Sequence, residues 1–252
     1  MKALITGATS GLGMAMAEIL SNKGWELMLT GRNQKILDEL KKRLKTNVYT
    51  ITADLSKPDE VYRLYSECSK HSIDLLINNA GFGVFGYFEK TSLKSEIDMI
   101  NLNITAVHIL TKLFLRDFLR RNHGHILNIA SGAGFMTGPL LSSYYASKNY
   151  VVRLSLAIAE ELRHKKTNVK ISVFCPGPID TEFNKRAGIH FSVKPTSAKS
   201  MAFYALSNTF KGKTVIIPTL SMKSGVLASK ILPERIITAV NYRIQKNKSG
   251  AK

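Results

Sequence analysis

The chain has 252 residues, of which 44% are hydrophobic and 21% are charged. This composition is that of a globular protein, and it excludes a disordered, collagen-like or coiled-coil chain. The length predicts a single α/β domain with a well-buried core rather than two domains. The sequence shows neither a signal-peptide pattern nor the roughly 18 consecutive apolar residues of a membrane span, so we expect a cytoplasmic protein.

The charge is strongly unbalanced, with 36 Lys and Arg residues against 18 Asp and Glu residues, a formal net charge of +18. Such a field attracts anions, including phosphorylated cofactors, nucleic acid and acidic membranes. The basic residues are scattered and accompany no RNA- or DNA-binding motif, so no nucleic-acid partner is expected. Cys68 and Cys175 form no CxxC pair and the six histidines show no ligand spacing, so we expect no metal site.

Short apolar runs alternate with longer amphipathic segments up to about residue 217. The runs have the length of buried strands, and the segments have helical spacing. The predicted strands are Ala3–Thr6, Trp25–Thr30, Val48–Thr52, Leu75–Asn78, His125–Ile129, Val169–Phe174 and Thr214–Ile217. The predicted helices are Gly13–Asn22, Gln34–Leu44, Asp59–Lys70, Leu93–Arg121, Tyr144–Lys165 and Ala198–Phe210.

This alternation predicts a doubly wound parallel sheet, a Rossmann fold with ligands at the carboxyl ends of its strands. Residues 1–217 would form the dinucleotide-binding and catalytic domain, and residues 218–252 a basic, helical C-terminal extension of the same domain. A helix over Ile231–Tyr242 would be apolar on one side and basic on the other. It could dock on its own domain or on a sister subunit, or make a weak contact with an anionic membrane.

Two short segments point to a phosphorylated dinucleotide. The glycine-rich turn Thr6–Gly13 joins the first strand to the first helix, where backbone amides and the helix dipole favour phosphate. The second strand is followed by Gly31, Arg32 and Asn33, where NAD-specific folds usually carry an acidic residue. Because a guanidinium suits a 2′-phosphate, Arg32 favours NADP over NAD.

Tyr144 and Lys148 lie four residues apart in a predicted helix, so their side chains share one face. An ammonium about 5 Å away would stabilise the phenolate by about 3 kcal/mol, so we expect Lys148 to lower the Tyr144 pKa. Tyr145 has no such partner, because Asn149 carries no charge. Ser131 follows the strand that ends at Ile129, so its hydroxyl is expected in the same region.

These motifs together resemble those of the short-chain dehydrogenase/reductase superfamily, in its NADP-preferring oxidoreductase branch, along nearly the whole chain. They are Thr6–Gly13, Asp54-Leu55, Asn78-Asn79-Ala80-Gly81, Asn103, Ser131, Tyr144-x-x-x-Lys148 and Pro176-Gly177-x-Ile179-x-Thr181.

The resemblance implies a role for each of four catalytic residues. Tyr144 would protonate a substrate carbonyl, Ser131 would orient it, Lys148 would bind the nicotinamide ribose, and Asn103 would hold a water that relays protons. The cofactor site implied in the same way comprises Gly7, Thr9, Ser10, Gly11, Leu12, Gly13, Arg32, Asn33, Asp54, Leu55, Asn79, Ala80, Gly81, Tyr144, Lys148, Pro176, Gly177, Ile179 and Thr181.

The substrate side carries apolar residues that would favour an apolar ketone or aldehyde, unless they belong to the core. A lid is expected over Glu182–Thr196. The candidate pocket residues are Phe82, Phe85, Phe88, Phe135, Met136, Leu140 and Phe183.

The sequence therefore predicts an NADPH-dependent carbonyl reductase. The resemblance implies a homodimer or homotetramer joined through the segments Leu93–Arg121 and Tyr144–Lys165. An NADP-binding sensor or scaffold without turnover is the alternative, but such relatives usually lack the tyrosine or the lysine. An epimerase or dehydratase of the same fold is disfavoured by the short chain and by the Pro176–Thr181 motif.

Overall fold

A computed structural model describes residues 1–180 and 196–248 of the chain. Its centre is a seven-stranded parallel sheet in the order β3-β2-β1-β4-β5-β6-β9. The order reverses between β1 and β4, which creates a crevice at the carboxyl ends of these strands. The strands are β1 (Lys2–Thr6), β2 (Glu26–Gly31), β3 (Val48–Thr52), β4 (Leu75–Asn78), β5 (His125–Ile129), β6 (Lys170–Phe174) and β9 (Val215–Ile216).

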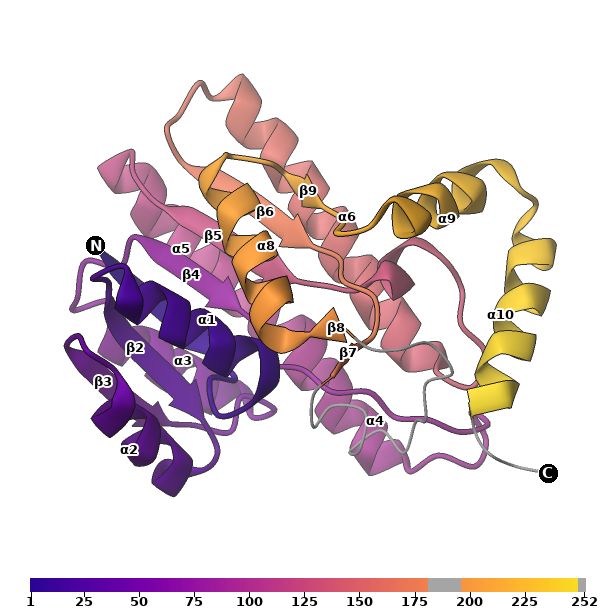
Figure 1. Cartoon of the computed structure of the whole chain (residues 1–252), viewed down its shortest axis with the longest axis horizontal. Coiled ribbons are helices and arrows are strands. Elements are labelled where there is room, and N and C mark those ends of the chain that lie inside the picture. The colour runs from indigo at the N-terminus through magenta and orange to yellow at the C-terminus, as the bar shows by residue number, and fades with distance from the viewer. Residues whose placement is uncertain (181–195, 249–252) are drawn as a thin grey trace.

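Helices cover both faces of the sheet, which is why the strands are continuous apolar runs (Figure 1). In β1, Ala3 and Ile5 enter one hydrophobic cluster and Leu4 enters the other. The first cluster is closed by α1 (Gly11–Asn22), α2 (Gln34–Arg43) and α8 (Ala198–Phe210). The second is closed by α3 (Pro58–Cys68), α5 (Val107–Arg121) and α6 (Ser142–His164). The predicted Rossmann fold is confirmed.

The single helix predicted over Leu93–Arg121 is wrong, because a π-helical turn interrupts it. The segment consists of α4 (Leu93–Ile100), the π-helix η1 (Asn101–Ala106) and α5. Within the π-helix, the Asn103 side chain bonds both backbone groups of Phe82, donating to the oxygen at 2.9 Å and accepting from the nitrogen at 3.1 Å. This tertiary contact holds the side chain at a position that a regular helix pattern does not reveal.

The C-terminal segment forms two helices, α9 (Leu220–Ile231) and α10 (Glu234–Lys248), which extend from the α/β body (Figure 1). The helix predicted over Ile231–Tyr242 is therefore wrong at its start. Leu232 is extended, with ψ of 147°, because the ring of Pro233 disfavours a helical residue before it. None of the helices in the described part of the chain has the length and apolar character needed to cross a membrane.

One face of α10 docks on its own domain. The Asn241 side chain donates to the Thr137 carbonyl oxygen at 2.7 Å, and the hydroxyls of Tyr242 and Tyr87 lie 3.1 Å apart. Thr137 follows the 3₁₀ turn η2 (Gly132–Phe135) and precedes α6, so the bond from Asn241 holds α10 beside the segment that follows β5. A separate two-stranded sheet is formed by β7 (Ile179–Asp180) and β8 (Thr196–Ser197).

Candidate active site

A cavity of about 390 Å³ lies at the carboxyl ends of the parallel strands. Its walls contain most of the residues that the sequence assigned to cofactor and catalysis, from the turn after β1 to the Pro176–Ile179 segment after β6. Thr181 lies outside the described residues. The predicted site residues that lie beside the cavity without lining it are Gly13, Asn33 and Asn103.

The glycine-rich turn is tied to the segment after β4. The Asn79 side chain donates to the carbonyl oxygens of Thr6 at 2.9 Å and Gly7 at 3.1 Å. A Cβ atom at Gly13 would lie 2.4 Å from the Gly7 oxygen, so only glycine permits this close packing. Ser10 makes no side-chain cap at the start of α1, which leaves the first amides of this helix available to an anion.

Arg32 lies at the end of β2, is exposed and lines the cavity. Within residues 1–180 and 196–248, no carboxylate forms an ion pair with it. Asn33 has a structural role instead, since its Oδ1 accepts a hydrogen bond from the Ile36 amide at 3.2 Å and caps α2. The Arg32 guanidinium, which has no carboxylate partner among these residues, can therefore serve as a cation at the rim of the cavity where the nucleotide is expected.

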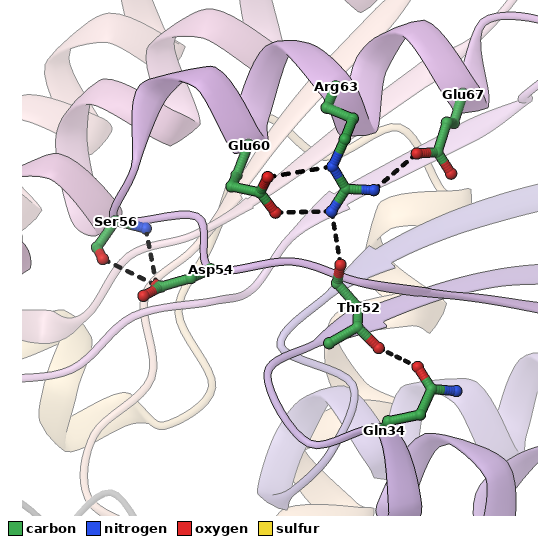
Figure 2. A network of polar contacts seen from close by, with 7 residues as sticks. All are labelled: Gln34, Thr52, Asp54, Ser56, Glu60, Arg63 and Glu67. Carbon is green, nitrogen blue, oxygen red and sulfur yellow. Dashed lines mark hydrogen bonds and ion pairs between the residues drawn. The ribbon is translucent and has the colours of Figure 1, made fainter.

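A charged network fixes the loop between β3 and α3 (Figure 2). Arg63 donates to the Thr52 carbonyl oxygen at 2.7 Å and to the carboxylates of Glu60 at 2.6 Å and Glu67 at 2.7 Å. The hydrogen bond from Arg63 lowers the pKa of Glu60. Asp54, which lines the cavity, accepts from both Ser56 donors in the same loop. The sequence analysis missed this network, although Glu60, Arg63 and Glu67 have helical ion-pair spacing.

Three of the four predicted catalytic side chains, Ser131, Tyr144 and Lys148, meet at the end of β5. Ser131 accepts a hydrogen bond from the Ala133 amide at 3.1 Å, which fixes its hydroxyl, and it also bonds the Tyr144 side chain. Lys148 donates to the Ile129 carbonyl oxygen at 3.1 Å, and its Nζ lies 5.8 Å from the centre of the Tyr144 ring. Both Tyr144 and Lys148 project from α6 into the cavity wall.

Burial sets the pKa values of this group. It raises the pKa of Tyr144 to about 12, although the hydrogen bond from Ser131 lowers it. It lowers the pKa of Lys148 to about 8. The expectation that Lys148 holds the Tyr144 pKa below its ordinary value is therefore wrong. Removal of the phenol from water is the largest effect on this pKa.

Asn103 is linked to the backbone of Tyr144 through the side chain of Ser147. Its Nδ2 lies 3.1 Å from Ser147 Oγ, and Ser147 in turn donates to the Tyr144 carbonyl oxygen at 2.7 Å. A Cβ atom at Gly81 would lie 2.9 Å from Asn103 Oδ1 and 3.4 Å from Lys148 Nζ. Gly81 thus lies against both Asn103 and Lys148, and the side chain of Asn103 is completely buried.

The apolar end of the cavity differs in part from the expectation. Phe82 and Met136 line it, but Leu141 takes the place expected for Leu140. Phe88 is 66% exposed, so its assignment to the pocket is wrong. Phe85 and Phe135 pack at the margins of hydrophobic clusters. Phe183 and the expected lid, apart from Thr196, lie outside the described residues.

Two polar residues that the sequence analysis did not assign also line the cavity. These are Tyr145, which it set aside for want of a charged neighbour, and Gln245 of α10. No local pattern identifies Gln245, because its partner Tyr145 is 100 residues away in the chain.

A doubly wound sheet with a glycine-rich turn after β1 and a Ser–Tyr–Lys group after β5 is typical of oxidoreductases that use a nicotinamide dinucleotide. The chain belongs to the short-chain dehydrogenase family, whose model matches residues 1–190. An uncharacterized oxidoreductase of Staphylococcus saprophyticus is 32% identical over 212 residues, which cover 81% of this chain and 90% of that protein.

Solved structures agree with this assignment. A short-chain dehydrogenase from Sphingobium yanoikuyae in complex with NADPH has a TM-score of 0.83 and 28% identity, covering 91% of this chain and 92% of its own. A short-chain dehydrogenase/reductase from Burkholderia phymatum in complex with NAD has a TM-score of 0.81 and 25% identity, covering 90% of this chain and 91% of its own. The chain is thus a family member whose similar structures include complexes of both cofactors.

Replacing Lys148 with Met should stabilise the protein near neutral pH. The folded-state pKa of about 8 lies below the ordinary 10.5, so folding disfavours the charged form. This penalty, about 3 kcal/mol, is complete below pH 8 and disappears as the pH rises toward 10.5. The free energy of unfolding, measured by urea denaturation, should exceed the wild-type value by about 3 kcal/mol for Lys148→Met at about pH 7 and by less than half of that at about pH 9.5.

The matched control is Lys165→Met, at the exposed end of the same helix. It should change the free energy of unfolding by less than about 0.5 kcal/mol at both pH values. An effect of Lys148→Met that is the same at both pH values would contradict the assignment of a desolvated ammonium.

Proposed function

We propose that this protein is an NADPH-dependent carbonyl reductase that converts an apolar ketone or aldehyde to the alcohol. The observation that carries the proposal is the convergence of Ser131, Tyr144 and Lys148 on one cavity that also contains the phosphate-type turn. When bound, NADPH supplies the hydride to the carbonyl carbon. The side chains must then orient the carbonyl and deliver one proton to its oxygen.

Tyr144 is the proton donor in this proposal. With a pKa of about 12 it holds its proton at neutral pH, and the hydrogen bond from Ser131 stabilises the phenolate that forms after transfer. Lys148, with a pKa of about 8, is close to the working pH and so is suited to return a proton to the phenolate. As the family resemblance implies, Lys148 would also bind the nicotinamide ribose, and Asn103 would hold the relaying water.

The preference for NADP rests on Arg32. The close packing of Gly13 and the uncapped start of α1 form a cradle suited to the dinucleotide phosphates of either cofactor. Arg32 adds a cation at the end of β2, where a ribose 2′-phosphate would lie. A carboxylate at this position would favour NAD, and the chain has glycine and arginine there.

The preference for an apolar substrate rests on the opposite end of the cavity, where Phe82, Met136 and Leu141 contribute side chains. A sugar or nucleotide would leave its polar groups unpaired against such walls. A homodimer or homotetramer joined through α5 and α6 stays a prediction.

Tyr144→Phe should lower the rate of ketone reduction by about 10²–10⁴ because it removes the general acid. NADPH affinity, measured by fluorescence titration, should change by less than about threefold, since the ring remains. Turnover is measured as NADPH oxidation at about 340 nm with a panel of apolar ketones and aldehydes. The control is Tyr150→Phe, an exposed tyrosine of the same helix. Ketone reduction by Tyr144→Phe at the wild-type rate would contradict the proposed role of Tyr144. A wild-type protein that binds NADPH but reduces none of these compounds would favour the sensor or scaffold alternative.

Arg32→Ala should weaken NADPH binding by about 10- to 100-fold, the effect of losing a charge-assisted contact to phosphate. Its effect on NADH should be less than about threefold, because NADH carries no 2′-phosphate. Lys42→Ala, on the exposed far end of α2, controls for the change in net charge. Equal losses for both cofactors would show that Arg32 does not bind the 2′-phosphate.

We also propose that α9 and α10 bring the protein into weak contact with anionic membranes. The two helices expose Leu227, Ile231, Ile236, Val240 and Ile244. Exposed Lys and Arg residues accompany them, and Glu234 is the single acidic residue between Leu220 and Lys248. This combination of apolar and basic side chains suits an acidic lipid surface. Pairing two copies through the same face would instead bring like charges together.

Replacing Ile236, Val240 and Ile244 together by Ser should abolish most co-sedimentation with vesicles rich in phosphatidylserine. Phe203→Ser, an exposed position on α8, should leave sedimentation unchanged. Activity in solution reports on folding, because the three changed side chains face away from the cavity. A wild type that never co-sediments with these vesicles at low salt would reject the membrane contact.

A further inference from the structure

Gln245 is a buried polar residue with one unsatisfied end in the wall of the substrate cavity. It is 2% exposed, although it belongs to a helix with an exposed apolar face. Its Nε2 donates to the Tyr145 hydroxyl at 2.6 Å. Its Oε1 is buried and has no hydrogen-bond partner among the described residues. A buried acceptor without a donor is costly, so this oxygen calls for a function.

Tyr145 presents the complementary group. Its hydroxyl accepts the hydrogen bond from Gln245, which leaves its own hydrogen available for donation. Burial raises the pKa of Tyr145, although the bond from Gln245 lowers it, so the hydroxyl keeps its proton at neutral pH. The two residues together offer one acceptor and one donor.

The ring of Tyr145 is held in place from several sides. A Cβ atom at Gly138 would lie 2.3 Å from this ring, so the absence of a side chain there makes room for it. The ring also packs against Leu141, which Phe85 and Tyr144 contact as well. The ring centres of Tyr144 and Tyr145 are 6.2 Å apart with an interplanar angle of 76°. The Tyr145 hydroxyl and the Tyr144 hydroxyl, which would protonate the carbonyl, are therefore close enough for one small molecule to contact both.

Gln245 is held in position by the hydrogen bonds that anchor α10 to the rest of the domain. One turn earlier, Asn241 donates to the Thr137 carbonyl oxygen at 2.7 Å, and the hydroxyls of Thr238 and Thr137 lie 2.5 Å apart. These bonds fix the helix before it reaches the cavity. The backbone of Gln245 is thus held at a fixed position beside the cavity.

We propose that Gln245 and Tyr145 form a polar subsite that binds a hydroxyl group on the carbonyl substrate. The hydroxyl would donate to Gln245 Oε1 and accept from Tyr145 Oη, so that one substrate oxygen satisfies both groups. The neighbouring walls are apolar, with Phe82, Met136 and Leu141, which limits the polar content of the ligand to this point and the carbonyl. The proposal rests on the carbonyl-reductase function and narrows its substrate class to apolar hydroxyketones or hydroxyaldehydes.

The test compares ketones of one carbon skeleton: benzylacetone and its counterparts with a hydroxyl at the meta or para position of the ring. The readout is the ratio of kcat/KM for the hydroxylated ketone over kcat/KM for benzylacetone, from NADPH oxidation. Wild-type protein should prefer at least one hydroxylated ketone. Gln245→Met keeps the length of the side chain and removes both polar ends, and it should lower the ratio about 10- to 100-fold, mainly through KM.

Tyr145→Phe keeps the ring and should lower the same ratio, so the result does not depend on one variant folding well. Arg243→Met is the control for a general effect of changing α10, because its exposed side chain lies on the same helix without lining the cavity or anchoring Gln245. It should affect all the ketones alike and leave the ratio within about twofold.

The outcomes separate the two proposals. A wild type that reduces benzylacetone without preferring a hydroxylated ketone, or variants that leave the ratio unchanged, would overturn the subsite and leave the reductase function standing. Failure of the wild type to reduce any of these ketones would overturn the reductase as proposed, and the subsite with it.

Discussion

The site depends on an ammonium group enclosed in the protein. Lys148 is 5% exposed and donates to a single described oxygen, that of Ile129, at 3.1 Å. An ammonium has three hydrogens to donate, so this environment solvates it poorly and lowers its pKa to about 8. The charge of Lys148 works against folding, and a pKa near neutrality fits the proton transfer that we propose for this residue. The remaining architecture can be understood as the means of holding this side chain beside Tyr144.

Glycines that allow close packing of the backbone hold Lys148 and Tyr144 in this arrangement. A Cβ atom at Gly134 would lie 2.7 Å from the Lys148 carbonyl oxygen, so glycine lets the turn after Ser131 rest directly on α6. Gly81 likewise leaves room for the side chains of Asn103 and Lys148. Because the side chain is absent at both positions, three segments distant in sequence meet within hydrogen-bonding range. The geometry of the catalytic group is therefore determined as much by these glycines as by the polar residues.

The sequence predicted the sheet well because both faces of each strand are buried. Such strands appear as uninterrupted apolar runs, and the polar residues directly after them lie at the carboxyl edge by topology. Ser131 and Arg32 were located by this rule, whereas Asn79 was implied by the family resemblance, and the structure places all three around one cavity. The π-helical turn at Asn103 escaped prediction, because a contact with Phe82 rather than a local pattern accompanies it.

The direction of the Tyr144 pKa shift could not be predicted from the sequence for a related reason. The sequence gives the spacing of the tyrosine and the lysine, and this spacing yields the attraction between them. It contains no measure of how much water the fold removes from each group. In the folded protein desolvation is the larger effect, so the phenol is less acidic than in water rather than more.

The C-terminal helix shows how one element can carry independent roles. Asn241 and Gln245 lie four residues apart and so share the face that docks on the domain, whereas Ile236, Val240 and Ile244 follow the same spacing on the exposed face. A change on the exposed face can alter surface contacts without touching the cavity. A change at Gln245 alters the cavity from a position far from the glycine-rich turn and from Tyr144 in the sequence. If Gln245 binds the substrate as we propose, changes in α10 would alter substrate choice without changing Tyr144, Lys148 or the glycine-rich turn.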